Sequence, residues 1–406
     1  MNSMIQLRNY QRDAVYKMHN GCILVGGMGT GKSRTALAYY YILQGGKLDT
    51  KEYSYMRKDL KDLYIITTAR KRDTLEWEME LPQFLISANP DVAYYKHKVV
   101  IDSWNNIKKY VDVKDAFFIF DEQRVVGYGT WTKSFLKITK QNQWIILSAT
   151  PGDCWSDYIP VFIANGFFKN KTQFNNEHVI FAPYTTFPKI DGYLNTGRLV
   201  RLRNRILVQM KGTNPAARHD EEVICSYDII KYKEICKNRW NFWKEEPIQN
   251  ASEFCQCLRK IVNSDETREL AVLSILEKHP KAIIFYNYDY ELEILQNLGK
   301  NNGFEVGEWN GHKHQDIPEG EKWIYLVQYN AGSEGWNCLK TNTIIFYSQN
   351  YSYKTMIQAS GRVDRMNSPF SDLYFYYLKS KSSIDLAISR ALRAKKRFNE
   401  AKFFGL

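Results

Sequence analysis

The feature that most constrains this chain is the stretch Val25–Ser33, which reads VGGMGTGKS. Its spacing, G-x-x-x-x-G-K-S/T, is that of a phosphate-binding loop. An apolar run at 22–25 precedes it, and a segment of helical character at 34–40 follows it. Because strand, glycine-rich loop and helix are the context in which this motif binds phosphate, we expect backbone N–H groups and a helix N-terminus to face an anion here.

Two side chains of this loop have a defined chemistry. Lys32 is expected to reach the β- and γ-phosphates of a nucleotide, and the Ser33 hydroxyl is expected to ligate Mg²⁺. Upstream of the loop, the Gln11 amide can both donate and accept, as reading an adenine edge requires. The expected nucleotide-binding set consists of Gln11, Gly26, Gly27, Met28, Gly29, Thr30, Gly31, Lys32, Ser33, Arg34 and, in a glycine turn far along the chain, Gly335.

Continuous apolar runs alternate with stretches of helical character through two parts of the chain. The runs lie at 63–68, 98–104, 116–120 and 143–147 in the first part and at 281–286, 323–327 and 343–347 in the second. Such strands are typical of parallel sheets that are covered on both faces. We therefore predict an α/β fold with two sheet-containing units, and a helix with Leu75, Trp77 and Leu81 after the run at 63–68.

Two further polar motifs each follow an apolar run. Asp121 and Glu122 end one strand, and Ser148, Ala149 and Thr150 end another. Ligands of parallel sheets bind at the carboxyl ends of the strands, so we expect both motifs to lie beside the phosphate loop. Asp121 is expected to hold Mg²⁺, directly or through water, and Glu122 to orient or deprotonate an attacking water molecule.

A pair of arginines lies near the end of the second unit, in the segment Gln358–Arg365. Arg362 and Arg365 are three residues apart, so on a helix they would share a face. Two arginines on one face bind anions well and are candidate arginine fingers for a nucleotide. We therefore expect the catalytic set to be Lys32, Asp121, Glu122, Arg362 and Arg365.

The segment between the two units is basic and loosely patterned. It carries aromatic residues at 240–243 and four closely spaced arginines, Arg198, Arg201, Arg203 and Arg205. Basic residues mixed with aromatics can track a nucleic-acid backbone. A solvated helical insertion with a small core of its own explains the same pattern. The residues alone leave both interpretations open.

The composition narrows the class of protein. A chain of 406 residues with a net charge of +12 favours a polyanionic partner, nucleic acid first, although a charge that only maintains solubility explains the same balance. The seven cysteines are scattered and form no C-x-x-C pair, which is typical of reduced thiols in a cytosolic protein. No apolar run approaches the ~20 residues of a membrane span, so we expect a cytoplasmic protein without membrane contact.

In their order, these motifs resemble those of the superfamily 2 helicases, and among them the Swi/Snf-type translocases of double-stranded DNA. The resemblance covers most of the chain and rests on the segments 7–11, 26–33, 67–81, 121–124, 148–151, 283–286, 332–337 and 358–365. The chain departs from the usual family pattern at Asn9, Arg124, Ser333 and Trp336. Its size resembles that of small phage-encoded or mobile-element members.

This resemblance implies two RecA-like lobes with ATP between them and DNA across the top. It implies that Arg362 and Arg365 of the second lobe reach an ATP held by the first. Residues expected to couple hydrolysis to movement are Ser148, Ala149, Thr150 and Gln358. Residues expected to contact nucleic acid are Trp77, Arg198, Arg201, Arg203 and Arg205.

We therefore expect an ATP-binding lobe at 1–165, a linker and helical insertion at 166–275, and a second lobe at 276–406. The expected function is ATP-dependent movement of a monomer on duplex DNA, with ATP and Mg²⁺ as cofactors and replication or recombination proteins of a phage or its host as further partners. Two alternatives stay open. One is a superfamily 2 helicase directed to RNA or single strands, and the other is an ATP-dependent nucleic-acid clamp or loader that does not translocate.

Overall fold

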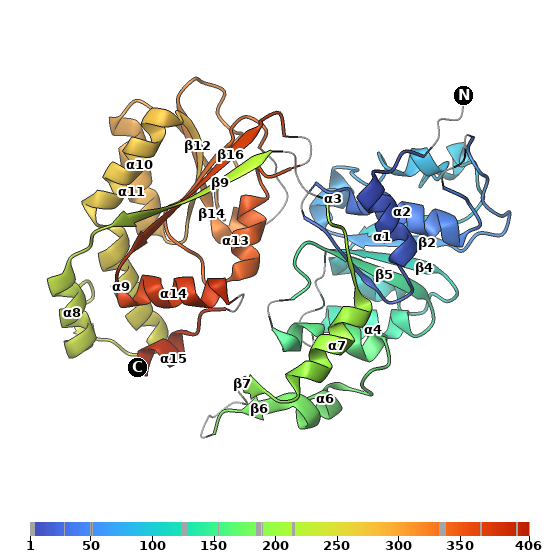
Figure 1. The fold of residues 1–406 in the computed structure, drawn as a ribbon, viewed down its shortest axis with the longest axis horizontal. Helices are drawn as coiled ribbons and strands as arrows, with labels where there is room; N and C mark the ends of the chain where they lie inside the picture. Colours follow the sequence, from blue (N-terminus) through green and yellow to red (C-terminus); the bar gives the residue numbers. More distant parts are fainter. Residues whose placement is uncertain are drawn as a thin grey trace. The chain divides into compact units, whose positions relative to one another are not determined.

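The computed structural model describes residues 5–27, 29–48, 50, 52–122, 125, 129–152, 154–183, 188, 190–212, 216–332, 338–365, 368–394 and 397–405. The chain divides into two compact units, Met1–Thr213 and Asn214–Leu406. In Figure 1 the first unit runs from blue to green and the second from yellow-green to red. Each unit contains one six-stranded parallel sheet, so the predicted α/β class with two parallel-sheet lobes is confirmed.

The first sheet has the strand order β3-β2-β4-β5-β1-β8, and its neighbouring strands are parallel. The strands are β1 (Ile23–Val25), β2 (Leu63–Thr67), β3 (Val99–Ser103), β4 (Phe117–Asp121), β5 (Gln143–Ser148) and β8 (Leu207–Gln209). Consecutive residues of a strand point to opposite faces, so Ile65 packs in one apolar cluster and Ile66 in another. Burial on both faces explains why these strands are apolar along their whole length.

Helices and 3₁₀ turns connect the strands of the first unit. The helices are α1 (Asn9–Lys17), α2 (Lys32–Leu43), α3 (Ala69–Asp73), α4 (Thr130–Thr139), α5 (Ile159–Ala164), α6 (Lys171–His178) and α7 (Thr196–Ile206). The 3₁₀ turns are η1 (Leu81–Phe84), η2 (Pro90–Val92), η3 (Trp104–Tyr110) and η4 (Trp155–Tyr158). An antiparallel hairpin of β6 (Val179–Phe181) and β7 (Ile190–Tyr193) precedes α7.

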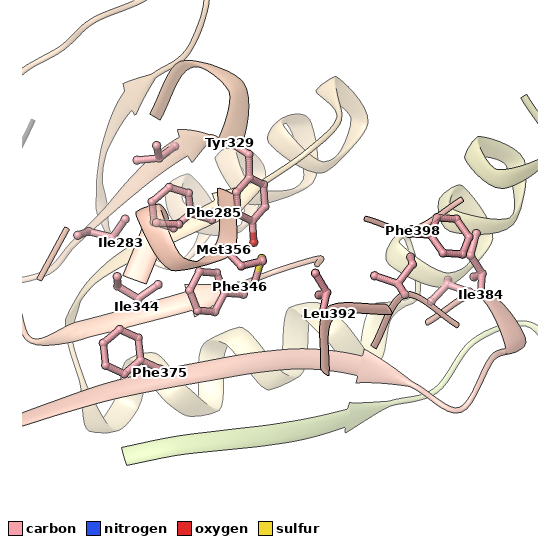
Figure 2. Close-up of a cluster of buried hydrophobic side chains, with 14 of the residues drawn as sticks. Ile283, Phe285, Tyr329, Ile344, Phe346, Met356, Phe375, Ile384, Leu392 and Phe398 are labelled. Atoms are coloured by element: carbon pink, nitrogen blue, oxygen red, sulfur yellow. The ribbon is translucent and has the colours of Figure 1, made fainter. Parts of the chain in front are cut away.

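The second sheet has the strand order β13-β14-β12-β15-β16-β9 and is likewise parallel. Its strands are β9 (Ala217–Cys225), β12 (Lys281–Tyr286), β13 (Glu305–Trp309), β14 (Trp323–Gln328), β15 (Thr343–Phe346) and β16 (Asp372–Ser380). Figure 2 shows its larger apolar cluster, in which Phe285, Phe346 and Phe375 come from three of these strands. A second cluster on the other face contains Ile284 and Ile345.

The second unit has eight helices among its described residues. They are α8 (Ile229–Asn238), α9 (Ala251–Asn263), α10 (Glu266–Lys278), α11 (Asp289–Asn301), α12 (Tyr329–Gly332), α13 (Tyr353–Ser360), α14 (Ser383–Arg393) and α15 (Glu400–Phe404). A short hairpin of β10 (Trp240–Asn241) and β11 (Glu246–Pro247) joins α8 to α9. None of the helices in the described parts of either unit is long and apolar enough to cross a membrane.

The prediction of a helix through Leu75, Trp77 and Leu81 is wrong. Helix α3 ends at Asp73, and turns follow it as far as η1. The helix end is a Schellman motif, in which the Glu76 N–H donates to the Lys71 carbonyl at 3.1 Å and Leu75 has a left-handed φ of 55°. Leu75 occupies a position that glycine usually takes, so the stop was not visible in the sequence.

Residues 166–275, expected as a separate insertion, are divided between the two units. Strand β8 pairs with β1 at the edge of the first sheet, and β9 pairs with β16 at the edge of the second over nine residues. The backbone hydrogen bonds of these two strands attach the segments around them to different sheets. The division between the units therefore falls at 213–214.

Candidate nucleotide-binding site

The phosphate loop lies between β1 and α2, as its sequence predicts. Helix α2 begins at Lys32, and Gly29 and Gly31 have left-handed φ values of 72° and 77°. A Cβ atom on Gly31 would lie 2.2 Å from Gln11 Nε2, so only glycine fits this position without a shift of the glutamine. Met28 lies outside the described residues.

The side chain of Lys32 lies within the curve of the loop. Its Nζ donates to the carbonyl oxygens of Gly26 at 2.9 Å and Gly27 at 2.8 Å. The Thr30 hydroxyl also donates to the Gly27 carbonyl, at 2.9 Å. Ser33 follows Lys32 in the first turn of α2, where helix N–H groups are available to an anion. The loop thus holds the Lys32 ammonium group within its curve, and Ser33 lies at the start of the helix that follows.

Gln11 is hydrogen-bonded to the phosphate loop at Thr30. Its Nε2 donates to the Thr30 carbonyl at 3.0 Å, and its Oε1 accepts from the Arg8 N–H at 2.9 Å. The Tyr10 hydroxyl donates to the same Thr30 carbonyl at 3.1 Å. A glutamine amide has two donor hydrogens and two acceptor lone pairs, so these bonds fix its orientation and leave one donor and one acceptor for a ligand.

A pocket of about 390 Å³ opens beside Gln11. It is lined by residues of the N-terminal segment, the loop and the turn before η1: Gln6, Leu7, Arg8, Tyr10, Gln11, Gly29, Thr30, Gly31, Arg34 and Glu80. Arg34 Nε and Glu80 Oε2 form an ion pair at 3.0 Å in this lining. The segment after β2 therefore contributes an acid, Glu80, to the pocket beside the phosphate loop.

Asp121 ends β4 and is buried. Its Oδ2 accepts from the Thr67 hydroxyl at 2.8 Å, from Lys71 Nζ at 2.9 Å and from Trp77 Nε1 at 3.2 Å. Burial disfavours the charged carboxylate, but attraction to the Lys71 ammonium and the hydrogen bonds from Lys71 and Thr67 outweigh it. The pKa of Asp121 is therefore held below its usual value, and the residue stays anionic.

Glu122 stands next to this buried acid and is more accessible. Its side chain is 35% exposed, and its Oε1 lies 3.6 Å from Lys71 Nζ. Its φ of 60° is left-handed, a conformation that costs a non-glycine residue about 1–3 kcal/mol and is common at functional sites. Although burial opposes the charge of Lys71, attraction to Asp121 and Glu122 raises the pKa of that ammonium. One cation therefore serves both carboxylates.

The position of Trp77 contradicts its expected contact with nucleic acid. The side chain is 1% exposed and packs in an apolar cluster of the first unit. Its indole N–H is the third donor to Asp121 Oδ2. Trp77 therefore supports the carboxylate from inside the unit and offers no ring surface to an external ligand.

The segment 148–150 is bonded to the phosphate loop. Val25 of β1 is aligned with Ser148 of β5, and the Gly26 N–H donates to the Ser148 carbonyl at 3.2 Å. The Ser148 hydroxyl accepts from the Thr150 N–H at 3.1 Å. Ala149 lies between them at the carboxyl end of β5. The structure thus brings together the three polar motifs that were expected to meet at this edge of the sheet.

The arginines of the second unit are not arranged as expected. Helix α13 contains Gln358 and ends at Ser360, so Arg362 and Arg365 follow the helix and do not share a helical face. Gly361 closes the helix, and a turn carries the chain through Arg362, which is 1% exposed. Glycine has a low helix propensity and commonly ends helices, which explains the early stop. Gly335 lies outside the described residues.

The arginine-rich segment forms α7, and three of its arginines cover aromatic rings. Arg198 lies over Phe168, Arg203 over Trp155 and Arg205 over Phe167, at 5.3, 5.1 and 5.0 Å from the ring centres. Arg198 also pairs with Glu177. Arg201 is exposed. These contacts attach the helix to its own unit, and contact of the four arginines with nucleic acid stays a prediction.

Comparison with known proteins finds similarity to one protein family and to solved structures. Residues 267–367 match the helicase conserved C-terminal domain. Among solved structures, the chain is similar to the Sulfolobus solfataricus SWI2/SNF2 ATPase core in complex with dsDNA, at 16% identity over 99% of this chain and 95% of that one, with a TM-score of 0.43. Comparison with curated proteins finds no match.

The range that is similar to helicase C-terminal domains includes the strands β12 to β15 and helix α13. It also includes Gln358, Arg362 and Arg365. The match to helicase C-terminal domains therefore covers the segment that contains both arginines of the expected catalytic set.

Sequence reasoning assigned no role to three residues of the site: Tyr10, Thr67 and Lys71. Thr67 and Lys71 could have been found, because they follow a predicted strand at its carboxyl end, where polar residues gather around ligands. Tyr10 gave no such signal, because its role depends on the path of the chain outside the sheet.

Proposed function

We propose that this protein is an ATP hydrolase of the superfamily 2 type that couples hydrolysis to movement on DNA. The observation that carries the proposal is the meeting of the phosphate loop, Asp121–Glu122 and Ser148 at one end of the first sheet. The similarity of residues 267–367 to the helicase C-terminal domain supports it from a separate part of the chain.

The residues present fit ATP with Mg²⁺. The loop curls so tightly around Gly31 that a Cβ atom would collide with Gln11, and glycine-rich loops of this kind can turn backbone N–H groups toward an anion. Asp121 is kept charged, as a metal ligand must be. Ser33 and Asp121 would hold the ion, and Gln11 would read the base. When bound, Mg²⁺ neutralises charge on the phosphate oxygens.

The protein side chains then have separate tasks. Lys32 exchanges its contacts with the Gly26 and Gly27 carbonyls for phosphate oxygens. Glu122, the accessible member of its pair, orients water and accepts its proton. Arg362 and Arg365 supply positive charge where charge develops on the phosphate. Ser148 shares a hydrogen bond with the loop, so a change at the phosphates can be passed to the segment 148–150.

Duplex DNA is the proposed track. The net charge of +12 favours a polyanion, and the order of the motifs resembles that of translocases of double-stranded DNA. Contacts with the phosphate backbone carry no sequence information and release counterions. Binding should therefore be insensitive to sequence and should weaken steeply with salt.

The test measures phosphate release with blunt duplex DNA, single-stranded DNA and RNA of matched length. Stimulation by blunt duplex, with displacement of the third strand of a triplex, is the expected result. Stimulation by RNA or single strands alone would favour the first alternative enzyme. Hydrolysis without displacement of the third strand would favour a clamp or loader. The Glu122→Gln variant controls for contaminating ATPases.

A further inference from the structure

The second unit carries an aromatic hairpin that the proposed ATP site does not use. We give this name to residues 240–247, which comprise β10, β11 and the turn between them. The side chains of Trp240, Phe242 and Trp243 are 38%, 37% and 44% exposed. Isolated exposed apolar side chains are ordinary, but three large rings within four residues of a surface turn indicate a binding surface.

Hydrogen bonds from and to side chains hold this turn in place. Asn241 is 4% exposed, and its Oδ1 accepts from the N–H groups of Trp243 at 3.1 Å and Lys244 at 3.3 Å. Its Nδ2 donates to Glu253 Oε1 at 2.8 Å. The Gln249 N–H donates to the other oxygen of that carboxylate, and with Asn241 and Lys244 it lowers the pKa of Glu253 to about 2. The rings are therefore presented by an ordered turn.

A cation and a further ring lie beside the hairpin. Lys260 Nζ, on α9, is 4.6 Å from the centre of the Trp243 ring and 5.7 Å from that of Tyr290. Tyr290 stands at the start of α11, and its ring stacks on Tyr288 with centres 5.4 Å apart and an angle of 11° between the planes. Because α11 follows β12, this group lies at the carboxyl end of a strand, where parallel sheets bind ligands.

We infer that the aromatic hairpin, together with Lys260, is a stacking site for the unpaired bases of a nucleic-acid single strand. The nucleic-acid class of the partner rests on the proposed function. Every base has a flat π face, so stacking on Trp240, Phe242 and Trp243 needs no particular sequence. Lys260 supplies a positive charge for the phosphate of a stacked nucleotide. The enzyme would thus hold an unpaired strand in addition to a duplex.

The composition of the hairpin favours bases over an apolar protein surface. Residues 240–247 read WNFWKEEP and contain no Leu, Ile, Val or Met. Rings next to a lysine are the combination that single-strand binding proteins use, whereas the charge of Lys260 would have to be desolvated beneath an apolar partner. The site is therefore assigned to nucleotides.

The test measures binding without ATP, by fluorescence anisotropy of two labelled probes of roughly 16 nucleotides, a length within the range of single-strand sites. One probe is oligothymidine, and the other is a strand of abasic sugar phosphates with the same charge. The wild-type protein should bind oligothymidine about tenfold more tightly or better, because only that probe can stack. Trp243→Ala should reduce this preference about tenfold and leave affinity for the abasic strand unchanged.

Three control variants make the result specific. Trp243→Phe should retain most of the preference, because a ring remains. Lys260→Ala should weaken binding of both probes. Tyr94→Ala, which removes a ring that is 60% exposed in the first unit, should change neither affinity. Equal affinity of the wild-type protein for the two probes, or a preference that Trp243→Ala leaves intact, would overturn the assignment. Because ATP is absent, this outcome is independent of whether the protein hydrolyses ATP.

Discussion

The two sheets each have a buried carboxylate near their carboxyl ends, and the two acids are held in different ways. Asp121, in the first unit, accepts from a cation, Lys71, as well as from neutral donors. Glu291, on α11 of the second unit, is fully buried and accepts from Asn263 Nδ2 at 2.7 Å, the Asn287 N–H at 2.8 Å and the Ser348 hydroxyl at 2.9 Å.

Burial of an acid does not by itself identify a reactive site. The donors to Glu291 come from separate segments and fix the loops after β12 and β15 relative to α9, which is a structural task. Asp121 shares its cation with Glu122, which is partly exposed and has a left-handed backbone. The first sheet end therefore combines a buried carboxylate with an accessible one, whereas the donors around Glu291 hold separate segments together.

The largest effect is expected from Lys32→Ala. The substitution removes the charge that faces the phosphates, so ATP turnover should fall below detection in a phosphate-release assay. Lys61→Ala is the matched control, because Lys61 pairs with Asp115 at the surface of the same unit. That variant should hydrolyse ATP at the wild-type rate. Normal turnover of the Lys32→Ala protein would contradict the assignment of the ATP site to this loop.

Arg362→Ala tests whether this arginine of the second unit contributes to hydrolysis. If Arg362 acts as an arginine finger, hydrolysis should fall on the order of 10³-fold. Because the side chain is buried, thermal unfolding must first show that the variant is folded. Arg390→Ala, an exposed arginine on α14, is the control and should be silent. Normal turnover of a folded Arg362→Ala protein would rule out the finger role for Arg362.

Glu122→Gln retains the shape of the side chain and removes its basicity. Hydrolysis should fall by about 10²-fold or more, while binding of a fluorescent ATP analogue persists. Nucleic-acid affinity in the presence of ATP should persist or rise. Loss of nucleotide binding together with hydrolysis would instead show that Glu122 has a structural role, like that of Glu291.

Lys71→Met keeps the length of the side chain and removes the cation shared by Asp121 and Glu122. We expect kcat to fall about tenfold, because both carboxylates lose the charge that positions them. The free energy of unfolding should fall as well, by about 1–3 kcal/mol, since Asp121 loses a donor. Lys71→Arg should recover part of kcat. A loss of stability with unchanged kcat would show that Asp121, like Glu291, has only a structural role.

Glu291→Ala should have the smallest effect on hydrolysis and still destabilise the protein. Removing the carboxylate leaves buried donors unsatisfied, which should lower the free energy of unfolding by about 1–3 kcal/mol in urea denaturation. The turnover of the folded variant should match that of the wild-type protein. Glu293→Ala, an exposed acid on the same helix, should leave stability unchanged. A specific loss of turnover in Glu291→Ala would contradict the assignment of a structural role.

Much of the first site could be predicted because its signals are local. The glycine spacing of the phosphate loop and the apolar runs before Asp121 and Ser148 each occupy a few consecutive residues. Parallel strands then bring their carboxyl ends to one edge, so the meeting of these motifs follows from fold class alone. At Leu75 the prediction failed because the local pattern and the backbone disagree, whereas at Gly361 the glycine was itself a stop signal that the expected helical face overlooked.

Local sequence pattern was sufficient to predict the parallel sheets, the phosphate loop and the acids that follow the strands, because strand burial and loop conformation depend on neighbouring residues. Three features depend on how distant segments meet in the fold: Trp77 is a buried donor to Asp121, Lys71 is shared by two carboxylates, and β9 is a strand. Strand β9 reads ARHDEEVIC and is mostly exposed, so it has no apolar pattern to reveal it. Its backbone hydrogen bonds with β16 fix it, together with cross-strand pairs such as Glu222 with Lys379 and His219 with Asp372. Such contacts depend on which segments meet in the fold.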